Sequence, residues 1–155
     1  MTSSNLVTAS SVFETMLIGD TYKIDENKIK KIIPGVDKKI FIPDSSIEKE
    51  NIILSIGRIQ KQKGQIQTLE FLNNFKKIQK DFKCYFIGGP SGKNGKEYLN
   101  ELKQSVEDLN LNSHVEFLDN LPQSEIIDLF KKAKLMIHTS PVSYTHLRAH
   151  ETSTY

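Results

Sequence analysis

This 155-residue sequence has one cysteine, no long apolar run and almost no excess of either charge. Because Cys84 is the only cysteine, no internal disulfide can form, and its place in the apolar run 84–87 favours burial in a reducing compartment. No apolar run approaches the ~20 residues that span a bilayer, and residues 1–19 lack the features of a signal peptide. We therefore expect a cytoplasmic protein.

The charge balance gives no reason to expect a nucleic-acid partner. The net charge is +2, from 21 basic and 19 acidic residues. A protein that binds nucleic acid through its backbone needs a basic surface that neutralises several phosphates. The lysine pairs here stand beside acidic or polar residues, without interleaved aromatics, which is typical of a solvated face.

Arginine is the scarcest cation. Residues 1–141 contain nineteen lysines and a single arginine, Arg58, which follows the apolar run 52–56 and Gly57. A guanidinium is a rigid, bidentate donor that suits phosphate oxygens better than an ammonium does. The one arginine of this span therefore stands at a candidate phosphate site.

The apolar pattern predicts a doubly wound α/β fold. Strand-like runs lie at 52–56, 84–87, 115–118 and 135–137, and helix-like patterns lie between them, the first over about 64–80 with one apolar stripe that ends at Ile78. Alternating strands and helices imply parallel β-α-β units with right-handed crossovers. Further upstream, 6–9 could form a strand and 11–18 a short helix.

Arg58 and Lys63 are five residues apart, at the predicted turn from strand to helix. Such a turn at the carboxyl end of a parallel strand, beside a helix N-terminus, is where phosphates are usually held. Both side chains could reach one diphosphate. On spacing alone, the alternative is that they are ordinary surface cations near a helix start.

Four blocks of the chain resemble the glycosyltransferase group 1 family, also called family 4. They are 33–37 (IPGVD), 53–64 (ILSIGRIQKQKG), 86–90 (FIGGP) and 115–122 (VEFLDNLP), and the resemblance covers about residues 6–141. It implies a GT-B architecture of two Rossmann-like domains, the second of which binds a nucleotide-sugar donor. It also implies sugar transfer to an acceptor hydroxyl, with retention of configuration, without a metal and without a cofactor.

The resemblance also assigns roles to seven residues. It makes Arg58 and Lys63 the catalytic pair that binds the diphosphate, and it makes five further residues substrate-binding. For the residues that follow the second and third predicted strands, the alternative is that they only form a turn or a loop. These five are Gly57, Gly88, Gly89, Asn120 and Leu121. The implied partners are a UDP- or GDP-sugar and a sugar, polysaccharide or glycolipid acceptor, with peripheral membrane contact through a missing domain.

The chain departs from the family after Pro141. The family continues into a glycine-bearing loop and two glutamates that contact the sugar and ribose, and this chain has neither. Instead, 142–155 contains no Lys or Ile and resembles translated adapter sequence, so Glu151 receives no role. His146 and His150 have a helical metal-ligand spacing but no evident third ligand, and we expect no metal site.

These observations predict three segments: the end of an N-terminal domain with a linker (1–37), a partial nucleotide-sugar-binding domain (38–141) and a non-native tail (142–155). We expect the parent protein to be a hexosyltransferase and the 155 residues alone to be inactive. Two alternatives stay open at this point. One is a nucleotide-binding or interaction module without catalysis, and the other is a phosphorylase or epimerase on the same architecture.

Overall fold

The computed structural model describes residues 5–37, 39–42 and 44–140. The chain divides into two compact units, one that contains the described residues 5–37 and one that contains those from 39 to 140. The predicted tail at 142–155, with His146, His150 and Glu151, lies outside the described residues.

The first unit is a small β-α-β element. Strand β1 (Val7–Ala9) pairs in parallel with β2 (Ile29–Lys31), and α1 (Val12–Tyr22) and the short 3-10 helix η1 (Glu26–Lys28) connect them. Ser11 caps α1 by accepting the Glu14 N–H, as expected of a serine at a helix start. The helix expected at 11–18 is longer than predicted, because it continues to a left-handed cap at Lys23.

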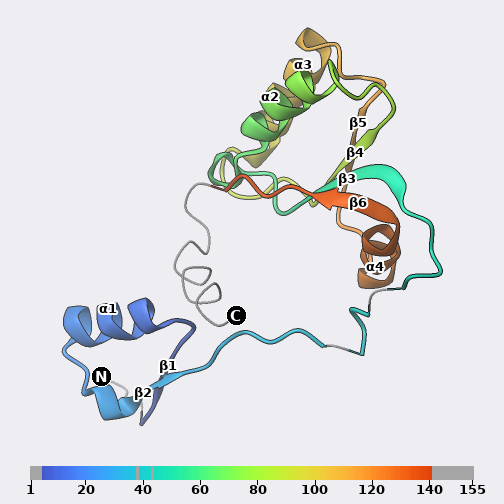
Figure 1. The fold of residues 1–155 in the computed structure, drawn as a ribbon. Coiled ribbons are helices and arrows are strands. Elements are labelled where there is room, and N and C mark those ends of the chain that lie inside the picture. The colour runs from blue at the N-terminus through green and yellow to red at the C-terminus, as the bar shows by residue number, and fades with distance from the viewer. Residues whose placement is uncertain (1–4, 38, 43, 141–155) are drawn as a thin grey trace. The chain divides into compact units, whose positions relative to one another are not determined.

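The second unit is built around a four-stranded sheet whose neighbouring strands pair in parallel (Figure 1). The strands lie in the order β5-β4-β3-β6. Their bounds, with those of the connecting helices, are β3 (Glu50–Ile56), η2 (Lys61–Lys63), α2 (Gln65–Phe75), β4 (Lys83–Ile87), α3 (Gly95–Asp108), β5 (Val115–Leu118), α4 (Gln123–Lys132) and β6 (Ala133–Met136).

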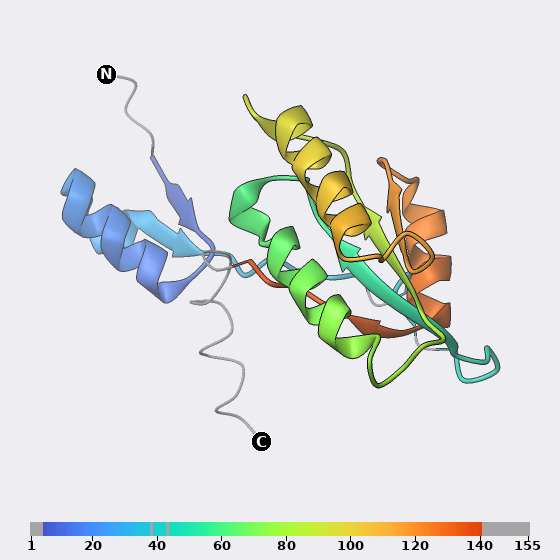
Figure 2. The same cartoon turned by 90° about the horizontal axis from the view of Figure 1, so that it is seen from above.

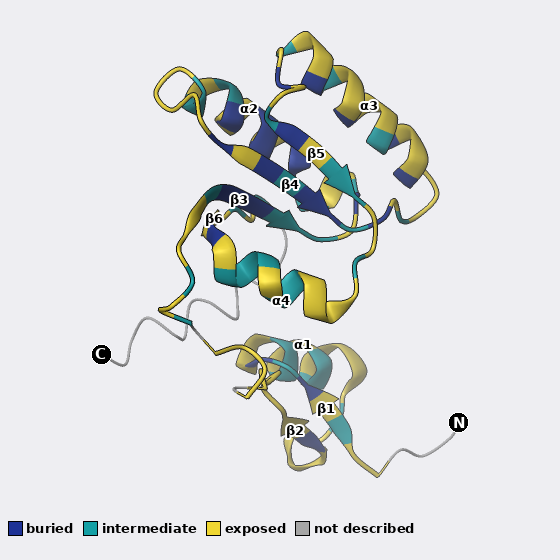
Figure 3. Cartoon of the chain, turned by 90° about the vertical axis from the view of Figure 1, so that its right-hand side faces the viewer, coloured by how far each residue is buried: buried dark blue, intermediate teal, exposed yellow. Residues whose placement is uncertain are grey.

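Helices cover both faces of this sheet (Figure 2). Alternate residues of β3 face opposite ways: Ile53 packs with α2 and α3, whereas Leu54 packs on the side of α4. Figure 3 shows the buried positions along the strands and on the inward sides of α2 and α3. The fold is therefore the expected Rossmann-like, doubly wound α/β sheet.

Two predicted element bounds are wrong. Helix α2 ends at Phe75 and not at residue 80, and Ile78, the last residue of the predicted stripe, is 87% exposed. The chain leaves the helix through a turn in which Phe75 O accepts two N–H groups, including that of Ile78. The last strand is Ala133–Met136 and not 135–137, although the Ile137 N–H still donates to Leu54 O at 2.8 Å.

The strand order places a topological switch point between β3 and β6. From β3 the chain adds β4 and β5 on one side, and it then returns through α4 to place β6 on the other side of β3. In open α/β sheets, ligands bind in the crevice at the carboxyl ends of the strands at such a point.

No helix within the described residues has both the length and the apolar composition of a membrane span.

Candidate functional site

The turn that follows β3 lies at the carboxyl end of the sheet, and we call residues 57–64 the cationic turn. Gly57 has φ +155°, and a Cβ there would meet no atom within 4 Å. Arg58 is exposed, whereas Ile59 is buried in the core and its N–H donates to Gly89 O at 3.0 Å. The loop after β3 therefore stays paired with the loop after β4, while the Arg58 side chain lies at the surface.

Lys63 lies at the other end of the cationic turn. It is the last residue of η2, it is half-buried, and its N–H donates to Gln60 O at 2.8 Å. Gly64 follows with φ +69°, and α2 begins at Gln65. Both cations thus lie between β3 and the N-terminus of α2, whose first N–H groups carry partial positive charge. The diphosphate role of this pair stays a prediction.

Of the two glycines after β4, Gly88 is required by the packing of the protein's own backbone. Gly88 has φ +132°, and a Cβ there would lie 2.5 Å from Gly57 O. A Cβ on Gly89 would lie 2.7 Å from Asp119 Oδ1. The close approach of the loops after β3 and β4 gives a reason for glycine at 88, and the substrate-binding role of both glycines stays a prediction.

Asn120 lies beside these glycines, whereas Leu121 faces another way. The Asn120 Oδ1 accepts the Gly89 N–H at 3.1 Å, so the loops after β4 and β5 are joined at the carboxyl edge. The Leu121 side chain packs with the core cluster on the α4 face of the sheet. Of the predicted substrate residues, Gly57, Gly88, Gly89 and Asn120 therefore lie together, and Leu121 has at least a packing role.

Four residues that the sequence analysis missed bond to the cationic turn or to the start of α2. Gln65 is buried, and its Nε2 donates to Arg58 O at 2.9 Å. The Ile66 N–H, in the first turn of α2, donates to the Tyr98 hydroxyl at 3.3 Å, and burial raises the pKa of Tyr98. Thr139 and Ser140, which follow β6, bond to carbonyls of the turn.

A shallow hollow of about 220 Å³ lies beside the cationic turn, between its η2 segment and the start of α3. Its lining includes Gln60, Lys61 and Tyr98, and the Lys61 ammonium lies 5.8 Å from the centre of the Tyr98 ring. Lys61 also pairs with Glu101 at 3.1 Å. Polar groups are therefore concentrated around this turn.

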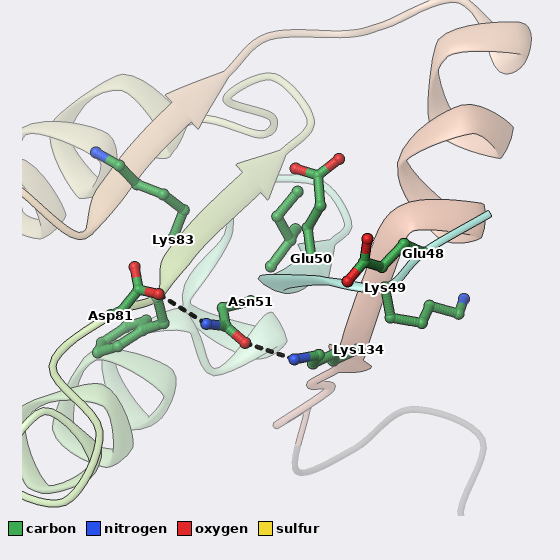
Figure 4. A pocket seen from close by; sticks show the side chains of 9 residues that line it. Glu48, Lys49, Glu50, Asn51, Asp81, Lys83 and Lys134 are labelled. Carbon is green, nitrogen blue, oxygen red and sulfur yellow. Dashed lines mark hydrogen bonds between the residues drawn. The ribbon is translucent and has the colours of Figure 1, made fainter.

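A second hollow, of about 570 Å³, lies at the opposite edge, where β3 and β4 begin (Figure 4). There Asn51 donates to Asp81 Oδ2 at 2.8 Å and accepts from Lys134 Nζ at 2.7 Å. These polar groups satisfy one another, and the amino ends of parallel strands are not the usual ligand site. We therefore place the candidate site at the cationic turn.

No group of three or more His, Cys, Asp or Glu is placed to hold a metal ion within 5–37, 39–42 and 44–140. His138 follows β6 and is exposed. The prediction of no metal and no cofactor stays a prediction.

Comparison with known proteins gives the family. The family described as Glycosyl transferases group 1 matches residues 37–145. The O-antigen chain mannosyltransferase RfbU of Salmonella typhimurium is 30% identical over 123 residues, which is 79% of this chain and 32% of that protein. The chain spans between about a quarter and a third of the length of the first curated relatives that it matches.

Two solved structures show the same fold. A glycosyltransferase from Rickettsia africae superposes with a TM-score of 0.70 at 27% identity, over 88% of this chain and 38% of that one. The C-terminal domain of the glycosyl transferase group 1 family protein LpcC from Francisella tularensis gives 0.58 at 23% identity, over 66% of this chain and 57% of that one.

The sheet, its two helical layers and the turn at the switch point define part of the Rossmann-like C-terminal domain of a GT-B protein. The chain belongs to the group 1 glycosyltransferase family.

Proposed function

We propose that the protein to which this chain belongs transfers a sugar from a nucleotide-sugar donor to an acceptor hydroxyl, with retention of configuration and without a metal. The observation that carries this proposal is the cationic turn. Arg58 and Lys63 lie between the carboxyl end of β3 and the N-terminus of α2, beside the switch point, in a chain of this family.

In this proposal Arg58 and Lys63 stabilise the departing nucleoside diphosphate. Negative charge grows on the diphosphate as its bond to the sugar breaks, so fixed cations bind the transition state better than the ground state. A charge-assisted hydrogen bond contributes about 1.5–3 kcal/mol net. The two cations then take the place that a metal ion would have on the leaving group.

The carboxyl edge of β4 and β5 forms the rest of the donor site in this proposal. Gly57, Gly88 and Gly89 present backbone at the edge without a side chain in the way. Asn120 fixes the backbone of Gly89 through its Oδ1. The backbone at Asn120 and Leu121 meets the base.

The donor is proposed to be a UDP- or GDP-sugar, and the acceptor a sugar, a polysaccharide or a glycolipid. The name of the RfbU relative, an O-antigen chain mannosyltransferase, supports transfer to a growing glycan. We place the reaction in the cytoplasm, with peripheral membrane contact through another domain.

We also propose that these 155 residues bind the nucleoside diphosphate but do not transfer sugar. The length of the relatives supports this proposal, since the chain covers 32% of RfbU. A transferase of this architecture needs an acceptor surface as well as a donor site.

Calorimetry with UDP and GDP on the 155-residue chain tests the proposal. Arg58→Ala and Lys63→Ala should each weaken binding about tenfold or more, because each removes a charge-assisted bond to phosphate. The matched control is Lys134→Ala, which removes a lysine from the opposite edge of the sheet and should leave the affinity unchanged. Equal affinities for all three variants and the parent would contradict the assignment.

A further inference from the structure

We infer that Thr139 is a positioning residue for the cationic turn. Its hydroxyl, paired with that of Thr68, holds the turn in the shape that binds the diphosphate. The inference rests on the proposed function only for the identity of the ligand. The contacts that support it lie on the two sides of the switch point between β3 and β6.

The Thr139 hydroxyl bonds to the last residues of the turn. Its Oγ1 donates to Gly64 O at 2.5 Å, and Lys63 O lies 3.4 Å away. These two carbonyls belong to Lys63, one of the proposed diphosphate cations, and to Gly64, which directly precedes α2. The side chain of a residue that follows β6 thus contacts the backbone carbonyls of Lys63 and Gly64.

Thr68 completes a short chain of hydroxyl bonds. It lies in α2, its side chain is fully buried, and its Oγ1 is 3.0 Å from Thr139 Oγ1. A hydroxyl carries one proton, and Thr139 uses its proton on Gly64 O. Thr68 is therefore the donor of the pair, and Thr139 satisfies a hydroxyl that is cut off from water.

The backbones are also in close contact at this point. A Cβ at position 64 would overlap the Thr139 carbonyl, and the positive φ of this residue also favours glycine. One residue further on, the Ser140 hydroxyl donates to Gln62 O at 2.8 Å. The segment 139–140 therefore fixes three consecutive residues of the turn, 62–64.

These contacts position the turn more than they stabilise the fold. Thr139 is half-buried, and its hydroxyl bonds to carbonyls of a surface turn and to one hydroxyl of α2. It is not part of either apolar core cluster. Loss of the hydroxyl should consequently loosen residues 62–64 while the sheet stays folded.

Three variants of the 155-residue chain test the inference. Thr139→Val removes the hydroxyl and keeps the shape, Thr139→Ser keeps the hydroxyl, and Thr68→Val removes the buried partner. In Thr139→Val the amides of Lys63 and Gly64 should exchange with solvent about fivefold faster, and UDP or GDP affinity should fall about fivefold. Thr139→Ser should restore both values, and Thr68→Val should shift both in the same direction by less.

The far end of α2 serves as the internal control. The Lys76 N–H, which donates to Leu72 O at 2.9 Å, should exchange at the parent's rate in every variant. The urea midpoint of Thr139→Val should fall modestly, because the buried Thr68 hydroxyl loses its partner. A merely structural role predicts the opposite, with the exchange of Lys76 rising together with that of the turn. That result, or a Thr139→Ser variant as impaired as Thr139→Val, would overturn the inference.

A failure of the proposed function can be distinguished from a failure of the Thr139 inference. If the parent chain binds neither UDP nor GDP, the donor assignment fails. The exchange rates of Lys63 and Gly64 still decide whether Thr139 holds the turn, because they need no ligand.

Discussion

Gly88 is the residue at which the candidate site depends most sharply on the absence of a side chain. The loops after β3 and β4 approach so closely that the Gly57 carbonyl occupies the space of a Cβ. Its φ of +132° is also one that other residues rarely adopt. The two constraints act together, so neither can be relieved by a rotamer change.

Gly88→Ala should therefore destabilise the chain by roughly 1–3 kcal/mol. The matched control is Gly35→Ala, since a Cβ on Gly35 would meet nothing within 4 Å. Urea unfolding of the two variants measures the difference. Equal midpoints would mean that the loops do not approach as closely as described.

Cys84 is expected to be chemically inert in the folded protein. It is fully buried in β4, and burial raises the pKa of its thiol to about 12. Since the thiolate is the reactive form, alkylation by iodoacetamide at pH 8 should be more than about a hundredfold slower in the native chain than in urea. Mass spectrometry of the alkylated chain measures both rates, and equal rates would contradict the burial.

The same shift gives a direction for stability against pH. The unfolded thiol loses its proton near pH 8.5, and the folded thiol does so only near about 12. The contribution of Cys84 to stability is complete below about pH 8.5, and it is lost as the pH rises from there to about 12.

At the scale of single residues, the sequence predicted positions better than contacts. Arg58 and Lys63 could be placed on one turn because an apolar run, a glycine and a helical pattern are local signals. The bond from Thr68 to Thr139 joins residues 71 positions apart, and threonines have no pattern that predicts such a pairing. Gln65 was missed for a related reason. In the sequence it resembles any polar surface residue, and no local pattern predicts that its side chain bonds to Arg58 O.

Among the elements, α2 shows where a periodic pattern overestimates a helix. Ile66, Leu69 and Leu72 pack on the sheet as the pattern predicts. Ile78 continues the same spacing, but the chain has already left the helix after Phe75, and Ile78 is exposed. Periodicity measures only spacing, and it cannot detect that the backbone turns out of the helix after Phe75.

This difference can be tested with two substitutions on one predicted stripe. Leu72→Ala should destabilise the chain by about 2–5 kcal/mol, because Leu72 is fully buried and its loss leaves a cavity. Ile78→Ser should change stability by less than about 0.5 kcal/mol. Urea unfolding separates the two expectations. A comparable loss for Ile78→Ser would show that the helix and its buried stripe extend beyond Phe75.

The strands were predictable because each is a short apolar run between turn signals. The run 115–118 is reproduced as β5 without change, and β3 and β4 differ from their runs only at the amino ends. The bounds of β6 moved because its pairing with β3, and not its own hydrophobicity, determines where it begins and ends. The order of the strands depends on such pairings, so the sequence alone predicted the fold class and not the neighbours of β3.

For the molecule as a whole, two edges of one sheet compete as the ligand site. The carboxyl edge carries the cationic turn, the glycines after β4 and Asn120. The amino edge has the hollow around Asn51, Asp81 and Lys134. The larger volume of its hollow would favour the amino edge, whereas the switch point and the N-terminus of α2 favour the carboxyl edge.

Amide chemical shifts recorded while UDP or GDP is added to the 155-residue chain decide between these edges. The account predicts that the shifts change at 57–64, at Gly88 and Gly89 and around Asn120, and that Asn51, Lys83 and Lys134 do not respond. Shifts confined to Asn51, Lys83 and Lys134 would contradict it.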